Sequence, residues 1–164
     1  MVNSADICLS SLRSAVLGTD QRFSHYQSLP SKIKKLLSID TGSYVPRQIP
    51  LDEARLSFMM ARVEMNEKKV TEIGSNLGYF CIEIADRVNA EVIGYEPIEA
   101  YAKVCNEMSF ALRMYPRMKF LNQSICLGDI GKLESADICI ELNVLHHAGV
   151  LYDQEVLTSL GGWR

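Results

Sequence analysis

The chain has 164 residues, a net charge of −3, and 48% hydrophobic and 23% charged residues, as in ordinary globular domains. This composition excludes collagen, coiled-coil, low-complexity and disulfide-miniprotein classes. No uncharged apolar run approaches the ~20 residues that a membrane span needs. The N-terminus lacks the basic start and unbroken apolar stretch of a signal peptide. We therefore expect a cytoplasmic protein with no membrane partner.

The charge argues against a nucleic-acid ligand, and the cysteine pattern argues against disulfides and metal sites. A nucleic-acid ligand requires a basic excess, whereas the pI here is about 5.6, so we expect no nucleic-acid partner. The cysteines are odd in number, widely spaced and without a C-x-x-C pair. They are therefore expected to be buried thiols rather than disulfides or metal ligands: Cys8, Cys81, Cys105, Cys126 and Cys139.

Residues 1–65 are expected to form a helical segment, with three roles left open: a lid, a substrate-binding segment or a dimerisation arm. Helices are predicted over 5–17, 31–38 and 51–65, with a Gly- and Pro-containing loop before the last. Apolar residues at helical spacing are expected to line the buried face of the third helix: Leu51, Ala54, Phe58, Ala61 and Met65.

Residues 66–164 alternate between strand and helix patterns, which indicates a parallel sheet with right-handed crossovers. The sequence predicts strands over 69–73, 91–95, 119–125 and 136–142. It predicts helices over 78–87, 99–113 and 151–160.

The first predicted strand runs into a glycine-containing turn. The strand carries Glu72, and the turn reads G-S-N-L-G from Gly74 to Gly78 before a helix begins. Gly74 allows a sharp turn and close approach of a ligand. A dinucleotide-binding turn would read G-x-G-x-x-G, but Asn76 replaces its second glycine. A carboxylate beside the turn would repel phosphate and favour a cationic ligand. The alternative is a tight turn without any ligand.

A second acidic residue ends the next predicted strand. Glu96 follows the segment V-I-G-Y and precedes Pro97. A carboxylate at this place can accept both hydrogen bonds from a ribose diol, and the apolar residues after it can lie against a purine. Glu96 could instead cap the helix over 99–113.

With these two motifs, the segment I-E-L-N-V-L-H-H from Ile140 to His147 resembles the class I S-adenosylmethionine-dependent methyltransferases, over about residues 66–160. The resemblance implies an α/β, Rossmann-like three-layer sandwich. Its mostly parallel sheet would have the strand order 3-2-1-4 and would follow the N-terminal helical segment. It also implies S-adenosyl-L-methionine as the cofactor.

The resemblance further assigns roles. Glu72 and Gly74 would lie by the amino acid part of the cofactor, Glu96 would bind the ribose hydroxyls, and Asn143 would lie near the transferable methyl group. The full predicted set of cofactor-binding residues is Glu72, Gly74, Ser75, Asn76, Gly78, Glu96, Pro97, Ser124, Ile125, Glu141 and Asn143.

Two assignments remain open within this resemblance. Ser124 and Ile125 are favoured for the adenine edge, and Asp129 in a Gly-Asp pair is the alternative. His146 and His147 follow the end of a strand, where a histidine could be a general base. They could equally well shape the pocket or lie in solvent.

The leading prediction is a methyltransferase acting on a small or medium-sized acceptor. The family sheet has seven strands and only four are recognisable here. We therefore expect a chain that lacks the later strands, forms a homodimer through the uncovered strand 136–142 and has little activity. The alternatives are a non-catalytic or truncated binding module and, more weakly, a nicotinamide-dependent oxidoreductase. No metal is predicted.

Overall fold

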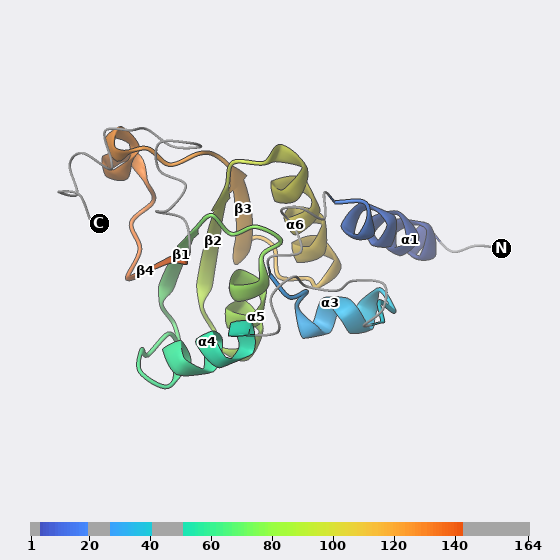
Figure 1. Cartoon of the computed structure of the whole chain (residues 1–164), viewed down its shortest axis with the longest axis horizontal. Coiled ribbons are helices and arrows are strands. Elements are labelled where there is room, and N and C mark those ends of the chain that lie inside the picture. The colour runs from blue at the N-terminus through green and yellow to red at the C-terminus, as the bar shows by residue number, and fades with distance from the viewer. Residues whose placement is uncertain (1–3, 20–26, 41–50, 143–164) are drawn as a thin grey trace.

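The computed structural model describes residues 4–19, 27–40 and 51–142 (Figure 1). The described elements, in chain order, are α1 (Ser4–Leu17), α3 (Ser31–Leu36), α4 (Leu51–Met60), β1 (Lys69–Ile73), α5 (Tyr79–Arg87), β2 (Glu91–Glu96), α6 (Glu99–Ala111), β3 (Met118–Asn122), the 3₁₀ helix η1 (Leu127–Lys132) and β4 (Ile138–Glu141). The helix predicted over 151–160 lies outside the described residues. Within them, no helix is long and apolar enough to span a membrane.

The strands form one parallel sheet in the order β3-β2-β1-β4 (Figure 1). This order confirms the α/β prediction, including the placement of the last strand beside the first. Strands β3 and β4 are shorter than predicted, at Met118–Asn122 and Ile138–Glu141. Helix α6 ends early, at Ala111, and Arg113 just beyond it has a left-handed backbone with φ of 58°.

The two faces of the sheet bury different clusters. Val70, Val92 and Met118 are in register across β1, β2 and β3 and belong to the main core that α5 and α6 cover. The alternate residues Ile93 and Tyr95 face the other way, because successive side chains of a strand point to opposite faces. A smaller cluster around them includes residues flanking η1, which lies across the sheet from α5 (Figure 1).

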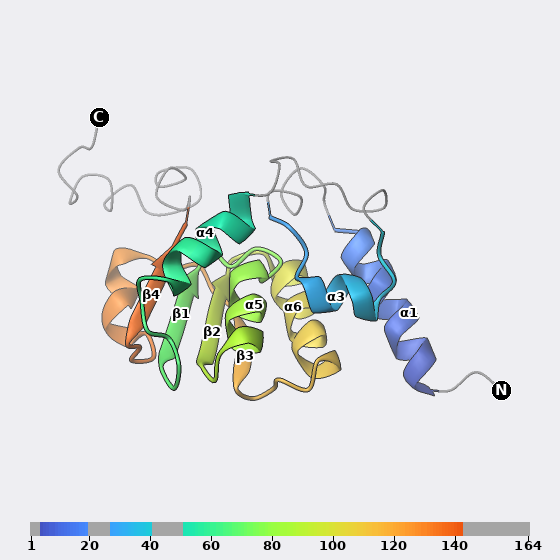
Figure 2. The same cartoon turned by 90° about the horizontal axis from the view of Figure 1, so that it is seen from below.

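The N-terminal helices add to the main core. Helices α1 and α3 lie beside α6 and α5, away from β4 (Figures 1 and 2), and Val16 and Ile33 are fully buried in that core. The amide of Ser31, the first residue of α3, donates to the Glu83 carboxylate of α5 at 2.6 Å. The N-terminal segment and the sheet therefore share one hydrophobic core.

Helix α4 corrects one prediction. It ends at Met60 and buries Asp52 and Leu56, whereas Phe58 of the predicted buried face is 58% exposed. Polar contacts set this orientation: Asp52 Oδ2 accepts from the Ser28 amide at 2.7 Å. Of the predicted core-facing set, Met65 is buried and the others are exposed: Leu51, Ala54, Phe58 and Ala61.

The cysteine prediction holds only in part. All five thiols are free, and Cys81 and Cys105 are buried, but Cys8 and Cys139 are exposed and Cys126 is partly exposed. Cys139 lies on β4 with its side chain on the face opposite α5, where the described residues leave it open.

Candidate functional site

The turn after β1 requires its glycines. Gly74 and Gly78 have φ of 73° and 72°, and Asn76 between them has φ of 52°. Gly78 is the N-cap of α5, and a Cβ placed on it would lie 2.8 Å from Phe120 Cζ on β3. The sequence interpretation of a sharp, glycine-dependent turn is therefore confirmed, with β3 as the crowded neighbour.

The backbone amides of this turn are used within the protein. Tyr95 O accepts from the first two amides, at 2.8 and 3.1 Å, and Glu96 Oε2 accepts from the Asn76 amide at 2.8 Å. The donors that the protein satisfies in this way are the amides of Gly74, Ser75, Asn76, Leu77, Gly78 and Tyr79. A pyrophosphate-binding turn needs free amides that point at the ligand. These six amides already donate within the protein, so they are not free to bind a pyrophosphate.

Glu96 connects the end of β2 to the turn. Its side chain is buried, and Oε1 accepts from the Ile98 amide at 2.9 Å while Oε2 holds Asn76. Burial raises the pKa of Glu96 to about 7, although the two amides act in the opposite direction. Each oxygen keeps a second lone pair, so the carboxylate can still accept from a ligand hydroxyl.

Glu72 has different surroundings from those that the sequence indicated. It lies beneath α5 with 1% of its surface exposed, and Oε2 accepts from the Cys81 thiol at 3.0 Å. Burial raises the pKa of Glu72 to about 8, with further contributions from the charges of Glu96 and Asp52. A carboxyl with that pKa is mostly protonated at neutral pH, so the occupied amides, rather than Glu72, disfavour phosphate here.

Ser75 carries an unused polar atom. Its Oγ is buried and is the one side-chain polar atom without a hydrogen-bond partner that the described residues bury. It packs against β2, since a Cβ on Gly94 would come within 2.9 Å of it. A buried hydroxyl without a partner is costly and calls for an explanation, such as a bound group or a water.

The predicted adenine-binding residues lie beyond β3. Ile125 is buried against Ile93 and Tyr95, and Ser124 is partly buried. The alternative, Asp129, caps its own turn: its carboxylate accepts from the Cys126 amide at 3.1 Å and from Lys132 Nζ at 3.1 Å. The assignment of the adenine edge stays a prediction.

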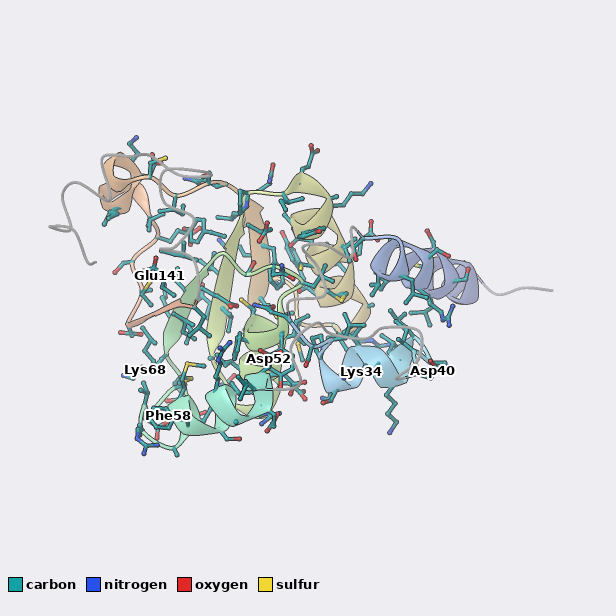
Figure 3. All side chains as sticks on the ribbon, viewed as in Figure 1. Lys34, Asp40, Asp52, Phe58, Lys68 and Glu141 are labelled. Carbon is teal, nitrogen blue, oxygen red and sulfur yellow. The ribbon has the colours of Figure 1, made fainter. Side chains whose placement is uncertain are left out.

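The remaining predicted residues lie on either side of this region. Pro97 is half-buried after β2. Glu141 is exposed at the end of β4, opposite Ile73 of β1 (Figure 3). Three predicted residues lie outside the described residues: Asn143, His146 and His147.

Sequence reasoning missed two amide side chains that shape the site. Asn122 Nδ2 donates to Glu96 O at 3.0 Å and to Pro97 O at 2.9 Å, which fixes the backbone after β2. Gln27 Oε1 accepts from the first amide of α5 at 3.4 Å. A polar residue in register with Glu96 on the neighbouring strand was a usable signal for Asn122, whereas no local pattern marks Gln27.

Comparison with known proteins identifies the fold. No family model and no curated protein matches the sequence. Among solved structures, WbdD matches with a TM-score of 0.55 and 20% identity over 83% of this chain and 29% of that chain. The C-terminal domain of precorrin-6Y C5,15-methyltransferase from Rhodobacter capsulatus matches with a TM-score of 0.50 and 16% identity over 69% and 58%.

A third match is an S-adenosylmethionine-dependent methyltransferase from Thiobacillus denitrificans in complex with S-adenosyl-L-homocysteine, with a TM-score of 0.48 and 17% identity over 73% of this chain and 46% of that chain. The chain spans less than two thirds of the length of each of the three structures. The first two likenesses show that it has a Rossmann-like α/β fold of the kind found in the precorrin methyltransferase domain. The fold that the sequence resemblance implied is thus confirmed.

Proposed function

We propose that this chain binds S-adenosyl-L-methionine and is part of a methyltransferase that acts on a small or medium-sized acceptor. The observation that carries the proposal is Glu96. It is a buried carboxylate at the C-terminal end of β2, beside a turn whose amides are already occupied. In open α/β sheets, ligands bind outside the carboxyl ends of the strands. Fold alone does not define a function, so the site supplies the argument.

The described residues fit this cofactor better than a dinucleotide. Its ribose offers two hydroxyl donors, which match the free lone pairs of Glu96, and it carries no phosphate that would need the turn amides. Ile98, which is 39% exposed after β2, offers an apolar surface to a purine. These features also disfavour the nicotinamide-dependent alternative.

When bound, the cofactor would supply an electrophilic methyl group on a sulfonium. Displacement at that carbon depends mainly on holding the acceptor in line. The chain's own residues would orient the cofactor through Glu96 and the Gly74–Gly78 turn. An acceptor that must lose a proton would also need a base, for which we propose His146 or His147. The homodimer predicted from the sequence remains part of this proposal.

Calorimetric titration with S-adenosyl-L-homocysteine tests the cofactor directly, without requiring turnover. Glu96→Gln should weaken binding by about 1–3 kcal/mol, because an NH2 donor would replace one of the two oxygens that accept from the ribose hydroxyls. Glu91→Gln is the matched control, since Glu91 is exposed at the opposite end of the same strand. Equal affinity of the Glu96→Gln variant and the parent, or tighter binding of NADH than of S-adenosyl-L-homocysteine, would overturn the proposal.

A further inference from the structure

A cleft lies at the end of the sheet where β1, β2 and β3 begin, opposite the proposed cofactor site. Its volume is about 670 Å³, within the range of small-molecule sites, and the residues that line it are Glu67, Lys68, Lys69, Asn89, Glu91, Tyr115, Pro116, Arg117 and Lys119. Glu91 and Glu96 mark the two ends of β2, which are ~16 Å apart at the usual rise per residue. The cleft is therefore separate from the proposed cofactor site.

The lining of this cleft is cationic although the whole chain has a net charge of −3. Four lining side chains are basic and two are acidic. The Lys69–Glu91 pair is loose, at 3.9 Å between exposed groups. Lys119 Nζ lies 2.7 Å from the exposed carboxylate of Glu134, and Lys68 has no ion pair with any described residue. The Asp137 carboxylate also accepts from the Lys69 amide at 2.9 Å. Lys68 and Arg117 are therefore the lining cations that no described carboxylate pairs with, and these two favour an anion.

Arg117 gives the cleft a fixed cation. Its Nη1 donates to Ala90 O at 2.9 Å and its Nη2 donates to Ala85 O at 3.0 Å. These backbone contacts hold the guanidinium in place without neutralising it. A guanidinium has five N–H donors, so some remain for a ligand oxygen. The flexible lysines around it can then adjust to the ligand.

An aromatic pair adds a stacking surface. The Tyr115 ring stacks on Phe110 with 4.3 Å between ring centroids and an interplanar angle of 28°. The two residues are 48% and 59% exposed, so part of each ring remains open to solvent. Tyr115 lines the cleft, so the stack presents a ring held in one orientation beside four cations. Cations beside an aromatic platform are the elements that bind nucleotides and single strands.

We propose that this cleft binds a nucleotide, with its phosphates on Lys68, Lys69, Arg117 and Lys119 and its base against Tyr115. The nucleotide can be free or part of a single-stranded nucleic acid, because both present the same phosphate and base chemistry. The site is independent of the proposed cofactor site.

Fluorescence anisotropy with labelled ATP and a labelled uridine decamer tests the proposal, at about 50 mM NaCl so that charges are not fully screened. The double variant Lys68→Glu/Lys69→Glu should weaken binding of the preferred probe about tenfold or more. The matched control is Lys34→Glu/Lys35→Glu, because Lys34 on α3 lies well apart from Lys68 (Figure 3). It should leave the affinity unchanged.

Tyr115→Ala distinguishes the contribution of the base to binding from that of the phosphates. It should weaken ATP binding about fivefold or more, since the base would lose its stacking surface, and should leave binding of inorganic tripolyphosphate unchanged. Tighter binding of the decamer than of ATP would identify a nucleic acid as the source, and equal or weaker binding would identify a free nucleotide. The proposal would be overturned if the two double-lysine variants lost the same affinity, or if Tyr115→Ala left ATP binding unchanged. Absence of binding of either probe at about 1 mM would also overturn it. Unchanged circular dichroism and S-adenosyl-L-homocysteine affinity would show that the variants remain folded.

Discussion

The two ends of the parallel sheet differ in how they use charge. At the C-terminal end, Glu72 and Glu96 are 1% and 4% exposed and are held by hydrogen bonds. At the N-terminal end, the side chains of Lys69 and Glu91 are 61% and 45% exposed and are 3.9 Å apart. Because the contacts at the C-terminal end are buried, losing any of them should cost stability. The exposed ion pair at the N-terminal end should contribute little to stability. The following substitutions test this difference, beginning with the largest expected effect.

Gly78→Val should lower the free energy of unfolding by about 2–5 kcal/mol. A β-branched residue would be strained at the φ of 72°, and its Cβ would collide with Phe120 at 2.8 Å. Urea unfolding measures the loss. Gly128→Ala is the control, because a Cβ there meets nothing within 4 Å, and its effect should stay within about 0.5 kcal/mol. A Gly78→Val variant as stable as the parent would contradict the crowded turn.

Glu72 should make stability depend on pH in the neutral range. Its pKa is raised from 4.5 to about 8 by burial, so the folded state holds the proton more tightly than the unfolded state. This contribution is complete below pH 4.5 and is lost as pH rises toward 8. The loss is at most about 1.4 kcal/mol per pH unit.

Comparing the parent with Glu72→Gln isolates this effect, because the other titrating groups are common to both proteins. The difference in unfolding free energy should shift in favour of Glu72→Gln as pH rises from 4.5 to about 8. Parallel pH profiles of the two proteins would show that Glu72 does not bind its proton more tightly in the folded state.

Tyr115→Ala should cost about 0.5–1.5 kcal/mol of stability, which is the usual contribution of a stacked aromatic pair. The ring stacks on Phe110 at the exposed end of the sheet, so less apolar surface is lost than in the core. Thermal unfolding measures the change, and Phe110→Ala should give a similar value. A double variant that costs the full sum of both would argue against a direct interaction between the rings.

Lys69→Gln should have the smallest effect, below about 0.5 kcal/mol, because its ion pair with Glu91 is long and exposed. The same urea titration serves as the measurement, with a second series at high salt. A loss above about 1 kcal/mol would mean that the N-terminal end of the sheet also contributes to stability and that the contrast between the ends is weaker than described.

Much of the fold was predictable because patterns of residues close together in the sequence indicate its strands, helices and turns. Short apolar runs separated by helical repeats indicate a parallel sheet, and the turn from Gly74 to Gly78 marks the end of β1 through the conformational needs of glycine. The position of Glu96 at the end of β2 followed from the same alternation. The structure agrees with these predictions within a few residues at each element boundary.

The remaining features depend on contacts between segments distant in sequence. The face that α4 buries was predicted wrongly, because the buried hydrogen bond from Ser28 to Asp52 joins residues 24 positions apart. The protonation of Glu72 could not be predicted, since its environment comes from α5 and α4 as well as from its own strand. The basic cleft also gathers residues from separate loops and strands, and no contiguous motif marks it.

The hydrogen bond from Ser31 to Glu83 has a consequence for where the chain can be cut. Glu83 is 4% exposed, and its two oxygens accept from the Ser31 amide and from Arg87. A fragment beginning at residue 66 would lose the first donor and uncover the surface of α5 and α6 on which α1 and α3 pack. Because the N-terminal helices and the sheet share one hydrophobic core, they should melt in a single calorimetric transition.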